Sequence, residues 1–171
     1  MSAALPLATI PVGVVVERTK GLTQWTDYLW RPAGVLTGEP ETPAWTRLSG
    51  NDERAIYFAG SATIELHRTE TPNYRENLES GAPQLWIGLR PSGGEPPYEL
   101  IGVTADPAEG EAMTEAGDNI VEPVPMPEAI CDAVAAFVTE HNFERSFVKR
   151  KRDRANPDVL GRRAPAKGDG R

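Results

Sequence analysis

The sequence predicts an α+β fold with a mainly antiparallel sheet of about six strands, two short helices and one C-terminal packing helix. Short β-branched and aromatic runs follow one another in neighbouring groups, without the long intervening helices of a doubly wound sheet. Only the segment that begins at Pro127 keeps a helical period over several turns. The length of 171 residues suits one domain, which we place at 1–148, and a basic tail at 149–171, with disorder expected beyond about residue 157.

Six strands are expected from runs rich in β-branched and aromatic residues, at 10–18, 27–36, 54–60, 61–68, 84–91 and 98–105. The first has apolar side chains on both faces, which predicts burial on both sides. Pro32 places the second strand at a sheet edge or a bulge. Gly60 is expected to bend or turn the chain between the third and fourth strands, and the glycines of 92–97 suit a hairpin. The segment 119–127 begins as a short strand and becomes extended where its prolines alternate.

Three helices are predicted from capping residues and periodicity. Thr71 is a candidate N-cap of a two-turn helix, with Pro72 at its first position. Asp106 is expected to cap a second, surface helix. The third helix starts at Pro127. Its single apolar face consists of Ile130, Val134, Phe137, Val138 and His141.

The charge is distributed very unevenly along the chain. The whole chain has a net charge of −7, yet residues 149–171 contain nine basic and three acidic side chains, a net charge of +6. The remaining residues therefore carry −13. An acidic body repels phosphate backbones and only the short tail attracts them, so nucleic-acid binding is a minor hypothesis. The basic run at 149–154 better suits an acidic protein surface, an anionic cofactor or the body of its own chain.

Cysteine and histidine are too scarce for several kinds of site. Cys131 is the single cysteine, so no intramolecular disulfide can form and a cysteine-based metal cage is excluded. His67 and His141 lie 74 positions apart, and we expect no metal centre and no cofactor of the protein's own. The N-terminal segment lacks the basic region of a signal peptide, and no apolar run approaches the roughly 18 residues of a membrane span. We therefore expect a cytoplasmic protein without a membrane partner.

No motif of known catalytic chemistry is present in the sequence. It contains neither glycine-rich phosphate loop, GxxxxGK[ST] or GxGxxG, and no GxSxG elbow. Glu65 and His67 share one strand face and form a pair suited to a proton relay, although a solvated outward face explains them as well. Cys131 is expected to be a half-buried small apolar residue. The chain is therefore not expected to be an enzyme.

The aromatic stretch WTDYLWR is the best candidate for a partner-binding surface. Trp25, Tyr28 and Trp30 are large apolar side chains with a polar tip, and Arg31 adds a charge. Aromatic residues and arginine are enriched at interface hot spots. The alternative is that two of these aromatic residues fill the core of the sheet. Further candidates for contact with an anionic partner are Arg75, Lys149, Arg150, Lys151, Arg152 and Arg154.

Several blocks resemble one family of short bacterial proteins. They are IPVGVVVER, WTDYLWRPAGVL, ATIELHRTETPNYRENLES, VTADPAEGEA, IVEPVPMP and FVKRKRDR, and they span residues 10–154. The family is a domain of unknown function whose genes are commonly found beside those of molybdenum-dependent formate dehydrogenases and their maturation factors. The resemblance implies a role in that setting. It supplies no catalytic residues, because the family has no established mechanism.

The leading hypothesis is a non-catalytic accessory protein for assembly or maturation. Its partner would be a molybdenum-dependent formate dehydrogenase, one of the maturation factors or the molybdopterin cofactor. A small structural subunit of the mature dehydrogenase complex is the first alternative. An unrecognised enzyme that uses Glu65 and His67, and a nucleic-acid-binding protein that uses the tail, are the others.

Overall fold

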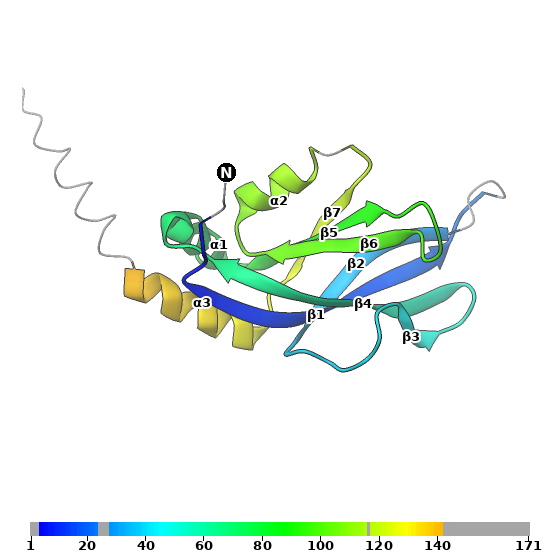
Figure 1. The fold of residues 1–171 in the computed structure, drawn as a ribbon, viewed down its shortest axis with the longest axis horizontal. Helices are drawn as coiled ribbons and strands as arrows, with labels where there is room; N and C mark the ends of the chain where they lie inside the picture. The colour runs from blue at the N-terminus through cyan, green and yellow to red at the C-terminus, as the bar shows by residue number, and fades with distance from the viewer. Residues whose placement is uncertain (1–3, 24–27, 116, 142–171) are drawn as a thin grey trace, which may run out of the picture.

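The structure is a computed structural model that describes residues 4–23, 28–115 and 117–141. In these residues it contains seven strands in two antiparallel sheets and three α-helices (Figure 1). The strands are β1 (Ala8–Lys20), β2 (Tyr28–Thr37), β3 (Thr46–Gly50), β4 (Arg54–Leu66), β5 (Gln84–Pro91), β6 (Tyr98–Thr104) and β7 (Ile120–Pro125). The helices are α1 (Thr71–Leu78), α2 (Pro107–Met113) and α3 (Glu128–His141), and a 3₁₀ turn (Arg68–Glu70) precedes α1. The predicted α+β class is confirmed.

The first sheet has the strand order β2-β1-β4-β3. β1 is central and pairs with β4 along nearly its whole length. The prediction of two separate strands at 54–60 and 61–68 was therefore wrong, because one unbroken partner strand pairs with both halves. Gly60, with φ of +129°, lies opposite Val14 beside a register shift, so it bends β4 without ending it. β2 lies at the sheet edge, and its Pro32 adjoins a second register shift, as predicted.

The second sheet has the order β6-β5-β7. β5 and β6 form the predicted hairpin. β7 accommodates Pro123 and Pro125 because it is an edge strand, where a missing backbone N–H leaves no hydrogen bond of the ladder unmade.

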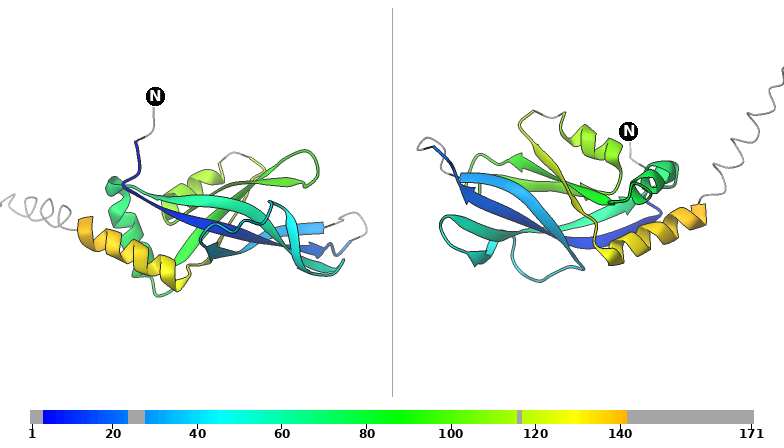
Figure 2. Two further views of the ribbon diagram at one scale, coloured as in Figure 1. Left: turned by 60° about the horizontal axis from the view of Figure 1, so that its bottom comes forward. Right: turned by 180° about the vertical axis from the view of Figure 1, so that it is seen from behind.

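The two sheets lie against each other and share one core (Figure 2). β2 approaches β7 on one side and β4 approaches β6 on the other, but within the described chain neither approach is a ladder of paired residues. The prediction of one sheet of about six strands was therefore wrong. The strands form two sheets that face each other across one core. Alternate side chains of β1 (Val12, Val14, Val16) and of β5 (Ile87, Leu89) belong to the same buried cluster.

α3 closes the core at the end that carries α1 (Figure 1). The predicted apolar face is confirmed by its buried residues Ile130, Val134, Phe137 and Val138. Phe137 meets Tyr74 of α1 edge-on, with ring centroids 5.9 Å apart. Tyr74 is fully buried, and its hydroxyl accepts a hydrogen bond from the His67 backbone N–H at 2.9 Å. This tyrosine therefore connects α3, α1 and the end of β4.

The helix starts agree with the sequence in one case and differ in another. Asp106 caps α2 as predicted, since its carboxylate accepts a hydrogen bond from Ala108 N at 2.9 Å. The predicted N-cap Thr71 was wrong, because Thr71 is the first residue of α1 and Glu70 precedes it. The 3₁₀ turn explains the difference: Thr71 follows it with helical backbone angles, which an N-cap residue lacks, and its hydroxyl donates to the Arg68 carbonyl at 2.7 Å.

Replacing Gly110 by alanine is expected to destabilise the protein, although alanine is the better helix former. A Cβ on Gly110 would lie 2.6 Å from Cγ and 2.8 Å from Cβ of Trp86, and these atoms are fixed to the backbone of β5. We expect Gly110→Ala to lower the free energy of unfolding by about 1–3 kcal/mol in chemical denaturation. Gly34→Ala is the matched control, because a Cβ there meets nothing within 4 Å. Equal stability of the two variants would contradict the prediction.

Tyr74 is expected to link stability to alkaline pH. Burial, the largest cause, raises the pKa of Tyr74 from 10.0 to about 12. A raised folded-state pKa means that the stabilisation by the neutral side chain is complete below pH ~10 and is lost as the pH rises to about 12. Denaturation between pH ~8 and ~12 should show the unmodified chain losing about 2 kcal/mol more than Tyr74→Phe. Parallel pH profiles for the two chains would refute this link.

Candidate functional site

An arginine ends the buried row of side chains on β1. The alternate valines from Val12 to Val16 are fully buried, and Arg18 follows two positions later in the same row. Arg18 pairs with Trp30 of β2 on one side and with the buried Ala55 of β4 on the other. The pairing therefore holds a charged side chain at the margin of an aliphatic core.

Aromatic rings surround the Arg18 guanidinium. Its central carbon lies 4.0 Å from the ring centroid of Tyr28, 5.3 Å from that of Tyr57 and 5.9 Å from that of Trp30. A guanidinium over aromatic faces gains about 0.5–2 kcal/mol, with the larger values where water is excluded. The rings therefore offset part of the cost of removing this charge from water.

Two cavities open beside this cluster, with volumes of about 380 and 330 Å³. Arg18, Trp30 and the β5–β6 loop line both of them. We call this region the Arg18 pocket; its residues are Arg18, Tyr28, Trp30, Trp45, Tyr57, Glu95, Pro96, Pro97 and Tyr98. These residues come from the first sheet, the β5–β6 loop and the start of β6. The start of β6 lies at the end of the molecule remote from α1 (Figure 1).

Trp45 is held against Trp30 by an unusual backbone conformation. Its φ of +67° lies in the left-handed region, which is rare for a bulky residue. The Trp45 N–H donates to the Phe58 carbonyl, and its ring meets Trp30 edge-on with centroids 5.8 Å apart. Such a conformation costs about 1–3 kcal/mol and is concentrated at binding and active sites. The strain at this position is therefore consistent with a binding role for the Arg18 pocket.

One polar atom in the pocket has no partner. The Nε of Arg18 is buried and forms no hydrogen bond with any described residue. A buried donor without an acceptor costs about 1–3 kcal/mol. A bound molecule that presents a carbonyl or carboxylate oxygen would supply the acceptor. The pocket is thus arranged to take an acceptor oxygen beside an aromatic surface.

Two of the predicted partner-binding residues lie in this pocket. Trp30 is half-buried at its centre, and Tyr28 is 38% exposed at its rim. Trp30 also packs against the core cluster, so it combines both roles considered from the sequence. Arg31 lies on the other face of β2 and pairs with Glu122 of β7, with Nη2 and Oε1 3.1 Å apart. Trp25 lies outside the described residues.

The structure does not bring Arg75 to this pocket. Arg75 lies on α1 at the opposite end of the molecule (Figure 1) and pairs with Glu79, with Nε and Oε2 3.2 Å apart. The basic residues at 149–154 lie outside the described residues, so their role in partner binding stays a prediction.

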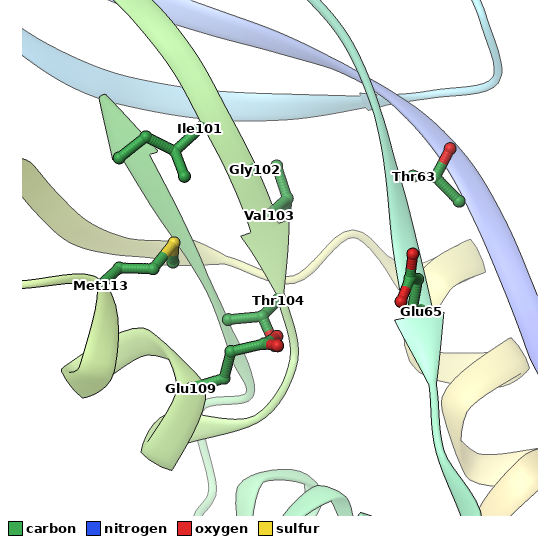
Figure 3. Close-up of a pocket in the computed structure, with 8 residues that line it drawn as sticks. All are labelled: Thr63, Glu65, Ile101, Gly102, Val103, Thr104, Glu109 and Met113. Atoms are coloured by element: carbon green, nitrogen blue, oxygen red, sulfur yellow. The ribbon is translucent and has the colours of Figure 1, made fainter. Parts of the chain in front are cut away.

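A third cavity, of about 280 Å³, lies between β4 and β6 (Figure 3). It is lined by Thr63, Glu65, Ile101, Gly102, Val103, Thr104, Glu109 and Met113. Glu65 belongs to β4 and Glu109 to α2, and they stand on opposite sides of the cavity (Figure 3). This cavity is therefore acidic on both walls.

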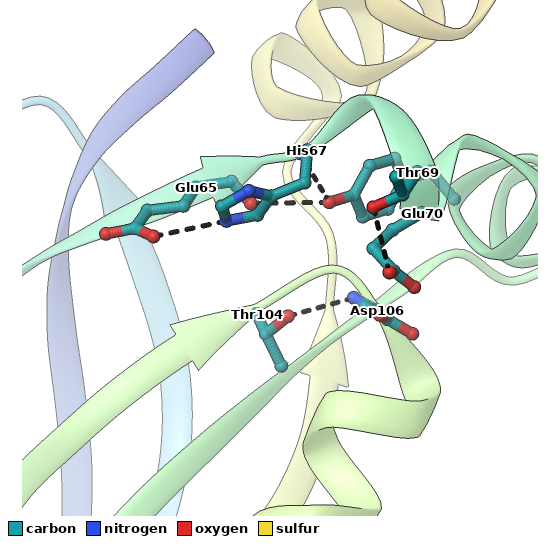
Figure 4. Close-up of polar contacts among 7 residues, drawn as sticks. Glu65, His67, Thr69, Glu70, Thr104 and Asp106 are labelled. Atoms are coloured by element: carbon teal, nitrogen blue, oxygen red, sulfur yellow. Dashed lines mark hydrogen bonds and ion pairs between the residues drawn. The ribbon is translucent and has the colours of Figure 1, made fainter. Parts of the chain in front are cut away.

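Glu65 and His67 are in contact, as the proton-relay alternative requires. The distance from His67 Nε2 to Glu65 Oε1 is 3.3 Å (Figure 4), and the two side chains are 25% and 56% exposed. A general acid or base must reach the group whose proton it transfers. Of this pair only Glu65 lines the third cavity. The geometry supports an exposed polar pair better than a relay that ends in a binding site.

Cys131 is half-buried, as predicted. Burial, followed by the negative charges of Asp132 and Glu128, raises the pKa of the Cys131 thiol, which disfavours the nucleophilic thiolate. Across 4–23, 28–115 and 117–141, no three His, Cys, Asp or Glu side chains are grouped to hold a metal ion. Within the same ranges no helix has the length and apolar character needed to cross a membrane.

Sequence reasoning missed most of the Arg18 pocket. The signal for Arg18 was present, because the period-two row that starts at Val12 reaches it after three buried valines. No local pattern marks Trp45 or Tyr98, because their place beside Trp30 depends on how the two sheets meet. The missed residues share only their arrangement in space.

The fold and the pocket define a small two-sheet α+β protein with an aromatic and arginine pocket where its sheets meet. The model of a protein family described as a protein of unknown function (DUF3305) matches residues 11–151, and the chain belongs to this family. The predicted membership of an uncharacterised family is thereby confirmed. No curated protein and no solved structure matches the chain.

Arg18→Met is expected to leave the stability nearly unchanged. The substitution removes a cation–π contribution of about 0.5–2 kcal/mol but also removes the buried donor, whose cost is about 1–3 kcal/mol. Chemical denaturation should show a change within about 1 kcal/mol, whereas Val16→Ala, in the same buried row, should lose about 2 kcal/mol or more. A loss above about 2 kcal/mol for Arg18→Met would make Arg18 a structural residue.

Proposed function

We propose that this protein is a non-catalytic accessory protein that binds a molybdenum-dependent formate dehydrogenase, or the molybdopterin cofactor of that enzyme, during assembly. The observation that carries the binding role is the buried Arg18 Nε without an acceptor, inside an aromatic pocket with two open cavities. The choice of partner rests on the resemblance of residues 10–154 to proteins encoded beside such dehydrogenases.

In this role the Arg18 pocket receives a carbonyl or carboxylate group that projects from the partner. Tryptophan, tyrosine and arginine dominate interface hot spots, because they bury large areas and still offer a polar tip.

A small structural subunit of the mature dehydrogenase would use the same surface. The two roles differ in stoichiometry, because a subunit stays in the active enzyme and an assembly factor leaves it. The enzyme alternative rests on the 3.3 Å contact between Glu65 and His67. It requires a substrate whose conversion depends on pH near neutrality and is abolished by His67→Ala.

The test is affinity purification of the tagged full-length chain from cells that produce the dehydrogenase, with the dehydrogenase quantified in the eluate. We expect the Tyr28→Ser variant to recover at most about one tenth of the dehydrogenase that the unmodified chain recovers, because truncation of a hot-spot aromatic costs about 2 kcal/mol or more. Leu36→Ser is the matched control. Leu36 lies on the same strand and is 43% exposed, against 38% for Tyr28, but it does not line the pocket.

Each outcome bears on a separate part of the proposal. Equal recovery by Tyr28→Ser and Leu36→Ser would remove the Arg18 pocket from the binding surface. An eluate of the unmodified chain without dehydrogenase, at both low and high salt, would overturn the choice of partner. Purified dehydrogenase that is fully active without this chain would favour the assembly role over the subunit role.

A further inference from the structure

β4 and β6 present unpaired edges to each other. In the described chain β3 pairs with β4 only as far as Phe58, so the second half of β4 has a hydrogen-bonded neighbour on one side alone. β6 is the outer strand of its own sheet. The two strands run in the same direction and the 280 Å³ cavity lies between them (Figures 1 and 3). We call this space the β4–β6 groove; an unpaired strand edge is a site where another extended segment can bind.

The backbone of Thr63 faces this groove. The Pro11 carbonyl accepts a hydrogen bond from Gly38 N at 3.2 Å, just beyond β2, so at Pro11 the backbone of β1 faces away from β4. Backbone groups alternate in direction along a strand, so Val12 faces β4, where it pairs with Ala62. Thr63 is the next residue of β4. Its N–H and C=O therefore point away from β1, towards the unpaired edge.

The charge of the groove determines what can bind there. Glu65 and Glu109 line it, and among the described residues Glu65 pairs only with His67, while Glu109 has no ion-pair partner. Glu70 and Asp106 lie beside the groove at the end nearest α1 (Figure 4). Opposite charge favours binding at a partly enclosed site of this kind. The occupant is therefore expected to be basic.

The chain itself contains a basic segment within reach. Residues 149–154 carry five basic side chains and one acidic one. The last described residue, His141, contacts the Phe137 ring with centroids 4.5 Å apart, and Phe137 lies 5.9 Å from Tyr74. The Tyr74 hydroxyl in turn lies 3.5 Å from the Glu65 carbonyl oxygen. These contacts pass through the buried Phe137 and Tyr74, so they place His141 near the groove without tracing a route for the chain. The seven residues between His141 and the basic segment span about 23 Å when extended.

We propose that the basic segment 149–154 binds in the β4–β6 groove of its own chain. Its backbone pairs with the open edge of β4 at Thr63, and its basic side chains lie against Glu65 and Glu109. This inference does not rest on the proposed function, because the groove shares no lining residue with the Arg18 pocket.

Disulfide trapping in the full-length chain tests this contact. In a Cys131→Ala background, the pair Thr63→Cys and Lys151→Cys is exposed to oxidised glutathione, and the cross-linked monomer is followed on non-reducing gels. We expect this pair to cross-link at least about ten times faster than Thr139→Cys with Lys151→Cys. Thr139 is exposed on α3 and far closer to residue 151 in the sequence, so an undocked tail would favour the control pair.

Charge variants separate docking in the groove from general attraction to an acidic body. Glu65→Gln or Glu109→Gln should slow the cross-link at least about five-fold, and roughly 0.5 M salt should slow it as well. Glu111→Gln is the matched control, because Glu111 is exposed on α2 but does not line the groove. Equal effects of Glu109→Gln and Glu111→Gln would overturn the proposal. A disulfide-linked dimer in place of the monomer would overturn it too, since the occupant would then come from a second copy.

Hydrogen exchange gives a second measurement that leaves the body of the chain unaltered. The variant Lys149→Glu, Arg150→Glu, Lys151→Glu, Arg152→Glu changes the tail alone. We expect the Thr63 amide to exchange at least about ten times faster in this variant than in the unmodified chain, because it loses its hydrogen-bond partner. Unchanged exchange at Thr63 would exclude pairing with the tail, and would leave the groove to a basic segment of another protein.

Discussion

The pairing of β1 with β4 is the constraint on which both surfaces depend. Side chains alternate along each strand, so the register that buries Val12 also carries Arg18 to the aromatic pocket at the far end. The same ladder occupies one edge of β4 and, because β3 has only five residues, leaves Thr63 exposed on the other. A slip of one residue would turn the valines out of the core and Arg18 out of its pocket. One register therefore sets the position of both surfaces.

The second sheet completes these surfaces by where it approaches the first. On the β2–β7 side, the ion pair of Arg31 with Glu122 bridges the sheets at 3.1 Å. On the β4–β6 side, a Cβ at Gly60 would come within 4.0 Å of Leu100, so the strands are close there. Further along, the acidic cavity lies between them. The sheets thus meet through side chains without a continuous ladder, and the space left between β4 and β6 is lined by carboxylates.

The sequence was informative where a local rule decided the structure. Pro32 can be tolerated only at an edge or a bulge, and the apolar period of α3 admits only one buried face, so both predictions were confirmed. Gly60 misled because a glycine that ends one strand and a glycine that bends a longer one look the same until the partner strand is known. The candidate site was predictable only in part for a similar reason. Tyr28 and Trp30 stand out in the local sequence, but their contact with Arg18 depends on the strand register. The contact of Trp30 with Tyr98 depends on how the second sheet approaches the first.

The uneven charge of the chain affects the β4–β6 groove and the Arg18 pocket differently. A net +6 tail on a −13 body suggests an anionic partner only if the tail is free to meet one. Glu65 and Glu109 belong to the same chain as these basic side chains, so they meet them at an effective concentration in the millimolar range. A separate anionic partner competes with the groove only at a comparable concentration or with a higher affinity. The Arg18 pocket is outside this competition, because its contacts are aromatic and its missing partner is a single acceptor oxygen. Recognition at the pocket therefore draws on aromatic contact and a hydrogen bond as well as on charge, while the tail responds to any acidic surface strong enough to displace it from the groove, and does so less at high salt.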